Sequence, residues 1–380
     1  MDHLKQCSPG ALPDIDDVCK LSRHGSLTLR NWLETYKRPS LTLSLQRDLR
    51  VEDFDELIVV AYYGSHALLA KLLERELDTY NIQDGSPATA VKWLMQSGDL
   101  IGVKLLLQNE SLRKKLRNNT FIYEMITLWK IFVNRDLTAS TTKATDKQWQ
   151  ELISILVGDF FDSDVASYEW ANTIFCHAAE NGCLPMIQSL FEKASRGQGF
   201  AKALLEENQT ISPYHSIGAA AFRNQPQVVR YLLMQKHVDI SSQLHHRTVK
   251  DKLNVIHCAA KSKNAEILRM LVERYPNGVN DVTHGGDTPL NLLIYGASVS
   301  VEAVRVLVGE GKADVGLTRG GAWYAPLRTA IRSGNVEVCR YLALCGADVD
   351  DAIEVDVVSE GFTLKAVSYT HLTLPTILRV

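Results

Sequence analysis

Residues 325–350 read Ala325-Pro-Leu-Arg-Thr-Ala-Ile-Arg-Ser-Gly-Asn-Val-Glu-Val-Cys-Arg-Tyr-Leu-Ala-Leu-Cys-Gly-Ala-Asp-Val-Asp350, and this pattern predicts two short helices joined by a tight turn. Pro326 suits the first helical turn, because its ring fixes φ and its missing N–H would have no helical partner there. Gly334 can take the left-handed conformation that ends a helix. An apolar stripe at helical spacing follows, formed by Val336, Val338, Tyr341 and Leu342. A hairpin this small cannot bury a core alone, so it predicts stacked neighbours.

The same pattern recurs upstream. Thr288-Pro-Leu opens one copy, Asn254-Val-Ile-His-Cys opens another, and Ser212-Pro opens a third, in which the helix is expected to begin one turn earlier. Aligning on the residue that ends the first helix gives steps of 34 to 42 residues, apart from one step of 84. The aligned positions are Gly25, Gly64, Gly98, Gly182, Asn224, Lys263, Ala297 and Gly334. Periodic helix pairs of this length are typical of a solenoid.

These copies resemble ankyrin repeats, whose pattern runs T-P-L-H-x-A-A-x-x-G, then V-V-x-x-L-L, then G-A-D-V-N. Residues 325–350 keep both glycines and the closing Gly-Ala-Asp-Val, while Ala325 replaces Thr and Arg328 replaces His; His257 keeps the family's His. The resemblance implies an all-α ankyrin-repeat solenoid of about nine stacked helix-turn-helix units with short hairpin loops. In the family that His hydrogen-bonds loop backbone between repeats, which implies the same structural role for His257. A generic array of helix pairs, of tetratricopeptide or HEAT type, is the alternative.

The repeat pattern divides the chain into five segments. Residues 1–17 are expected to be disordered, and 18–117 to hold diverged N-terminal ankyrin-like repeats. Residues 118–170 are expected to form an irregular repeat with an inserted loop, which would account for the long step. Residues 171–357 carry the well-defined repeats. Residues 358–380 look like a truncated repeat followed by a non-native, adapter-like tail.

Composition places the chain among ordinary folded proteins, with 46% hydrophobic and 22% charged residues. The net charge of −3 gives no general attraction for nucleic acid, and no apolar run is long enough to span a membrane. Seven scattered cysteines and no secretory signal favour the cytoplasm. The basic run Arg113-Lys-Lys-Leu-Arg117 leaves a nuclear location as an alternative.

The sequence contains no recognisable catalytic, cofactor or metal constellation. Gly309-Glu-Gly-Lys312 lacks the spacing of a phosphate-binding loop and is better explained as a helix end and turn. Cys176-His177 and His257-Cys258 are adjacent pairs that cannot chelate a metal by themselves, and no C-x-x-C or H-E-x-x-H occurs. We therefore expect no enzyme activity, no cofactor and no small-molecule substrate.

The function expected is a scaffold or adaptor that binds a protein partner through the concave face and loops of the solenoid. Two alternatives stay open: the recognition arm of a larger protein, such as a substrate-selecting subunit of a degradation or signalling complex, and an enzyme with its site in 118–170. The ends of the first helices and one hairpin loop supply aromatic and cationic residues, which often anchor interfaces. The candidate partner-binding residues are Tyr62, Tyr63, Phe222, Arg223, Lys261, Tyr295, Trp323, Tyr324 and Arg332.

Overall fold

The computed structural model describes residues 56–63, 66–74, 86–96, 99–116, 126, 150–155, 157, 171–205, 215–235, 241–248, 250–295, 299–317 and 325–348. All regular structure in these ranges is helical, which confirms the predicted all-α repeat fold. The chain splits into two compact units, one of residues 1–174 and 185–200, the other of residues 175–184 and 201–380. Residues 1–17 and 358–380 lie outside the described residues, and 118–170 are described at only a few positions. The boundaries predicted for those segments therefore stay predictions.

The first unit contains helix pairs that stack on one another. Helix α5 (Glu56–Tyr63) packs on α7 (Ser86–Gln96), and α6 (His66–Glu74) packs on α8 (Leu100–Gln108), which leads into α9 (Glu110–Lys115). Asp99 caps α8 by accepting a hydrogen bond from the Gly102 N–H at 3.0 Å, and it also contacts His66 Nε2 at 2.7 Å. This carboxylate therefore holds the start of one outer helix against the preceding one.

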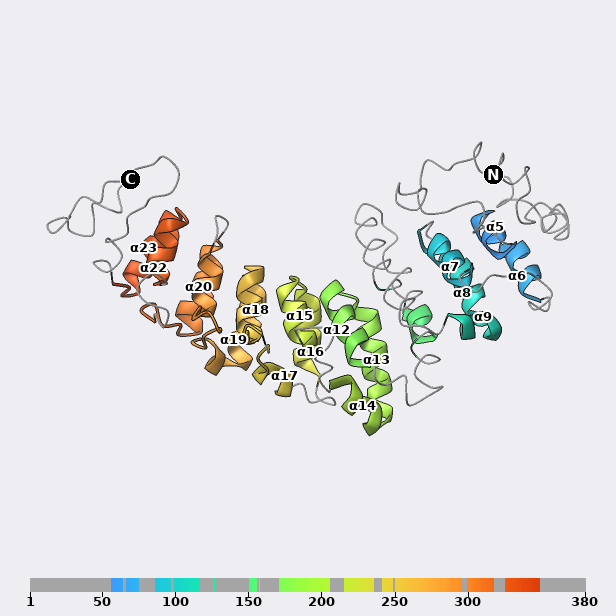
Figure 1. Ribbon diagram of the computed structural model, residues 1–380, viewed down its shortest axis with the longest axis horizontal. Helices are drawn as coiled ribbons and strands as arrows, with labels where there is room; N and C mark the ends of the chain where they lie inside the picture. The colour runs from blue at the N-terminus through green and yellow to red at the C-terminus, as the bar shows by residue number, and fades with distance from the viewer. Residues whose placement is uncertain are drawn as a thin grey trace. The chain divides into compact units, whose positions relative to one another are not determined.

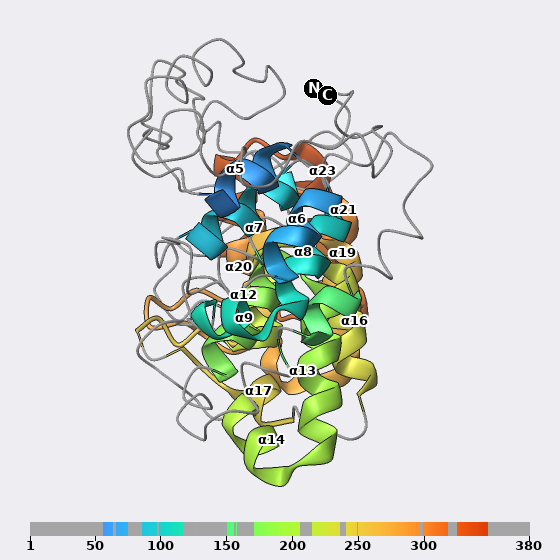
Figure 2. The ribbon, with the colours of Figure 1, turned by 90° about the vertical axis from the view of Figure 1, so that its right-hand side faces the viewer.

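The second unit has two layers of helices, visible side by side in Figure 1 and in edge view in Figure 2. The inner helices each pack on the next along the chain; they are α15 (Ser216–Phe222), α18 (Val255–Ser262), α20 (Pro289–Ile294) and α22 (Pro326–Arg332). The outer helices follow them in the same order; they are α16 (Pro226–Met234), α19 (Ala265–Arg274), α21 (Val301–Arg305) with its π-helical continuation Val306–Glu310, and α23 (Val336–Leu344). Shorter elements are α17 (Ser241–His245) and a 3-10 turn at Pro276–Gly278. Helices α12 (Ala171–Asn181), α13 (Leu184–Arg196) and α14 (Gln198–Leu205) precede this array in the sequence.

Small residues bring the inner helices together. Ala220, Ala259 and Ala330 are completely buried on α15, α18 and α22, while Leu293 and Ile294 are completely buried on α20. Alanine adds little side-chain bulk, so adjacent helices can approach closely and exclude water from the seam. The apolar stripe predicted for the last outer helix is confirmed at Val338 and Leu342, which have no exposed surface. Val336 is 54% exposed, because it occupies the first turn of α23 beside the left-handed turn rather than the face turned to α22.

The turn between inner and outer helix uses a left-handed residue at each aligned position that the structure describes in the second unit. Gly182 and Gly334 have φ of 78° and 70°, and Asn224 and Lys263 have φ of 59° and 57°. The alignment therefore identified the conformation correctly even where glycine is replaced. Proline occupies the first turn of five α-helices that the structure describes, at Pro87, Pro185, Pro226, Pro289 and Pro326.

His257 links two neighbouring repeats. Asn254 caps α18 by accepting from the His257 N–H at 3.0 Å, and the His257 ring accepts through Nδ1 from the Asn254 N–H at 3.2 Å. The opposite ring nitrogen, Nε2, donates to the Asp287 carbonyl at 3.2 Å, in the loop before α20. This confirms the structural role predicted for His257. Burial lowers the pKa of this imidazole from 6.5 to about 4, so the neutral form is held at neutral pH.

We predict that Lys263→Gly raises the free energy of unfolding by about 0.5–1 kcal/mol, because it removes the cost of a left-handed L-residue. Gly334→Ala is the reciprocal change: a Cβ there would meet no atom within 4 Å, so only backbone strain is added and stability falls by about 1 kcal/mol. Urea unfolding followed by circular dichroism measures both. A loss of stability in Lys263→Gly would show that the turn carries no such strain.

A second prediction concerns pH. The unfolded chain binds a proton at His257 below pH 6.5, whereas the folded chain does so only near pH 4, so stability falls as pH drops through this window. The slope contributed is at most about 1.4 kcal/mol per pH unit. His257→Gln should therefore be less stable at pH 7 but lose less stability between pH 7 and 5, as measured by urea unfolding. Equal slopes in the unmodified chain and in His257→Gln would contradict the assignment.

Candidate functional site

Four of the candidate residues occupy one repeated position in the second unit. Each lies six residues after the first residue of its helix segment: 216 to 222, 255 to 261, 289 to 295 and 326 to 332. Because successive inner helices pack side by side, this position recurs along one edge of the inner layer (Figure 1). We call this set the inner-helix row; it consists of Phe222, Lys261, Tyr295 and Arg332.

The first two members of the row are in direct contact. The Lys261 ammonium lies 5.8 Å from the centre of the Phe222 ring, and the Arg223 guanidinium lies 5.7 Å from it. Both distances are within the range of cation–π attraction, which at exposed sites is worth about 0.5–1 kcal/mol. Arg223 Nε also donates to Glu180 at 2.6 Å, and this ion pair attaches the end of α12 to the end of α15. The structure thus brings Phe222, Arg223 and Lys261 together as a cation–aromatic cluster.

The other two members of the row are open to solvent. Tyr295 is 73% exposed, and among the described residues its hydroxyl has no hydrogen-bond partner. Arg332 is exposed at the end of α22 and forms no ion pair with any residue that the structure describes. Exposed aromatic and arginine side chains are features of surfaces that bind partners.

The remaining candidate residues are placed differently. Tyr62 and Tyr63 are the last two residues of α5, in the first unit, and nothing is described of their side chains. Trp323 and Tyr324 lie outside the described residues, so their role in a projecting loop stays a prediction. The structure therefore describes a cluster of candidate side chains only in the second unit.

Charge is distributed unequally between the two layers of the second unit. The sequences of α15, α18, α20 and α22 contain no Asp or Glu, but they contain Lys261, Arg328 and Arg332. Arg328 is buried, so the cations that reach solvent are those of the row. Lys261 acts electrostatically on Asp287: burial raises the pKa of this carboxyl, and Lys261 opposes that rise. The inner layer therefore presents positive charge although the whole chain is slightly acidic.

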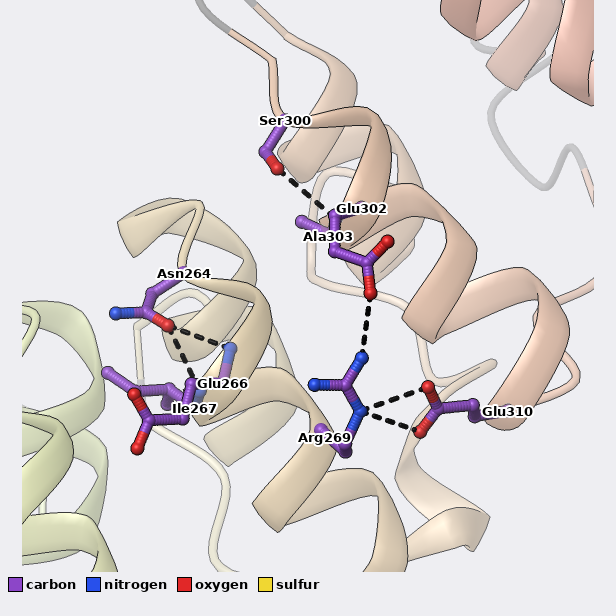
Figure 3. Close-up of polar contacts among 8 residues, drawn as sticks. All are labelled: Asn264, Glu266, Ile267, Arg269, Ser300, Glu302, Ala303 and Glu310. Atoms are coloured by element: carbon purple, nitrogen blue, oxygen red, sulfur yellow. Dashed lines mark hydrogen bonds and ion pairs between the residues drawn. The ribbon is translucent and has the colours of Figure 1, made fainter.

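The outer layer, in contrast, balances its cations with glutamates. Arg269 on α19 donates to Glu302 at 2.8 Å and to Glu310 at 3.0 Å, both in the next repeat (Figure 3). Arg230 on α16 pairs in the same way with Glu266 on α19. These contacts form an outer-helix ladder in which each arginine reaches forward by one repeat. The sequence analysis missed it, although the signal was present: an arginine stands five residues after each outer-helix cap, at 230, 269, 305 and 340.

Residues Gly309–Lys312 take part in this ladder and do not form a phosphate-binding loop. The preceding helix widens into a π-helical turn at Val306–Glu310, which places Glu310 against Arg269. Gly311 closes the turn through a hydrogen bond from its N–H to the Val306 carbonyl at 2.8 Å, and a Cβ at this glycine would lie 2.8 Å from the Leu307 carbonyl oxygen. Lys312 follows with a φ of 57°. This confirms the prediction of a helix end and turn.

The buried thiols and imidazole of the second unit are unsuited to catalysis. Burial raises the pKa of Cys176 and of Cys258 to about 12, so both stay protonated and poorly nucleophilic. His257 uses both ring nitrogens on backbone groups. No cluster of three or more metal-ligating side chains occurs in the described ranges. No helix described here has the length and apolar character needed to cross a membrane.

Comparison with known proteins supports the fold directly. Residues 217–319 match the family model for ankyrin repeats in three copies, and this range includes Phe222, Lys261 and Tyr295. No curated protein matches the chain. The helix pairs, their left-handed turns and this match lead to the same conclusion: the chain contains ankyrin repeats at residues 217–319.

Proposed function

We propose that this chain is a scaffold or adaptor that binds a protein partner along the inner-helix row. Ankyrin repeats generally mediate protein–protein interaction. The observation that carries the proposal is the recurrence of Phe222, Lys261, Tyr295 and Arg332 at one position of four successive inner helices. A row of aromatic and cationic side chains at regular spacing supplies several contacts to one extended partner, whereas isolated surface residues would not.

The chemistry of the second unit supports binding rather than catalysis. Its reactive side chains are either buried and protonated, as at Cys176 and Cys258, or committed to backbone hydrogen bonds, as at His257. None of the five cysteines of the described part forms a disulfide, which supports a reducing compartment, and we propose a cytoplasmic location.

We predict that Phe222→Ala combined with Tyr295→Ala reduces partner capture by at least about 30-fold, the loss expected when aromatic anchors are removed from an interface. The full-length chain and its variants would be used as bait, and captured proteins quantified by mass spectrometry. The matched control is Met234→Ala with Leu344→Ala, two exposed apolar residues at the ends of outer helices. Retention of every partner by the inner-row variant would overturn the proposed surface.

The hairpin loop requires its own variant. Trp323→Ala combined with Tyr324→Ala tests whether two adjacent aromatics next to the last inner helix also contact the partner. If the loop takes part, capture falls by a similar factor, while the circular dichroism spectrum is unchanged. Undiminished capture of every partner would remove this loop from the binding surface and leave the row.

A further inference from the structure

We infer that the inner-helix row binds an extended acidic peptide segment of a protein partner, with carboxylates at Lys261 and Arg332 and an apolar side chain at Tyr295. This inference rests on the proposed function and adds the chemistry of the segment that is bound. It rests on the different distribution of charged residues in the two layers of the second unit.

The outer-layer segments 226–234, 265–274, 301–310 and 336–344 carry five arginines and five glutamates, so their formal charges cancel. Arg230 and Arg269 are held by Glu266, Glu302 and Glu310 of the following repeats (Figure 3). A partner's carboxylate would have to compete with these glutamates, and it would meet their negative charge. The outer layer therefore has no preference for an acidic ligand.

The inner layer leaves its cations available. Lys261 and Arg332 form no ion pair with any described residue, and the four inner helices contain no acidic residue that could supply one. Lys261 lowers the pKa of the Asp287 carboxyl electrostatically, without forming an ion pair with it. Of the cations at the ends of these helices, Arg223 alone is neutralised, by Glu180. A carboxylate brought to Lys261 or Arg332 would therefore gain a pair without breaking one.

The spacing of the row defines the length of the segment. Packed helices lie about 8–10 Å apart, so Lys261 and Arg332, two repeats apart, are separated by about 16–20 Å along the row. An extended chain advances about 3.3 Å per residue, so the two carboxylates should stand five or six positions apart. Tyr295 lies between the two cations, and its exposed ring offers a platform for an apolar side chain midway along the segment. Phe222 extends the apolar contact by one repeat beyond Lys261.

Nucleic acid fits this surface less well than an acidic peptide. Affinity for a phosphate backbone grows with the number of cations that contact it, and the row contains only two, Lys261 and Arg332. The two discrete cations, separated by an aromatic ring, match a peptide with two separated carboxylates.

The test is a selection from a displayed library of random twelve-residue peptides against the full-length chain, followed by fluorescence anisotropy on the selected peptides. We expect enrichment of Asp and Glu in pairs five or six positions apart, with an apolar residue between them. Lys261→Gln combined with Arg332→Gln should weaken binding of these peptides by about tenfold, the effect expected from removing two exposed charge pairs. The matched control is Arg230→Gln with Arg274→Gln, which removes the same charge from the outer layer and should leave binding within about twofold.

Each outcome decides the inference. Selected peptides without acidic enrichment would overturn the acidic chemistry, and the proposed function would survive if partner capture still depends on Phe222 and Tyr295. Acidic peptides that bind both double variants equally would show that the row is not their site. Failure to select any peptide, or displacement of the peptides by a twelve-nucleotide single-stranded DNA at lower concentration, would also overturn it. Loss of partner capture in the row variants remains a separate measurement of the proposed function.

Discussion

Burial between successive inner helices is the constraint on which the second unit depends. No single helix pair has enough apolar surface to form a core, so each buries Ala, Leu and Ile side chains against the next pair, as Ala220, Ala259 and Leu293 show. The stability of such an array is a sum of repeat and interface terms. The same constraint aligns equivalent positions along the stack, and this alignment turns one residue per repeat into the inner-helix row.

The connections between repeats are polar: hydrogen bonds from buried side chains to loop residues join one repeat to the next. Asn254 donates to the Gly278 carbonyl and to Asp281, both at 2.8 Å, while His257 donates to the Asp287 carbonyl. These bonds satisfy buried donors and fix the loop before α20 relative to α18. Leaving such a buried group unpaired costs about 1–3 kcal/mol, so the loops are held in register with the helices they precede. The side chains at the far ends of the inner helices are therefore presented from a rigid support.

Sequence reasoning succeeded where local conformation decides the outcome. A helix-ending turn needs a left-handed residue, so periodic alignment located Lys263 and Asn224 although neither is glycine. The role of His257 also followed, because its position in the repeat fixes which loop it can reach. Helix α15 begins at Ser216, with His215 in extended conformation at the cap position, and residues 212–214, where the extra turn was expected, lie outside the described residues.

The contacts within the candidate site could not be predicted from the sequence. Its residues were found by their place before the turn, but sequence alone did not show that Lys261 and Arg223 both lie over Phe222, nor that Glu180 neutralises Arg223. These contacts depend on how far one helix is displaced along its neighbour, which periodicity does not specify. The same holds for the outer-helix ladder, where arginine recurs at a fixed position but its partner is set by a π-helical turn at Val306–Glu310. Matched charges on one layer and unmatched charges on the other are thus a property of the stacked repeats. In the outer layer, ion pairs join neighbouring repeats. In the inner layer, the cations of the row form no ion pair with a described residue and can bind a ligand.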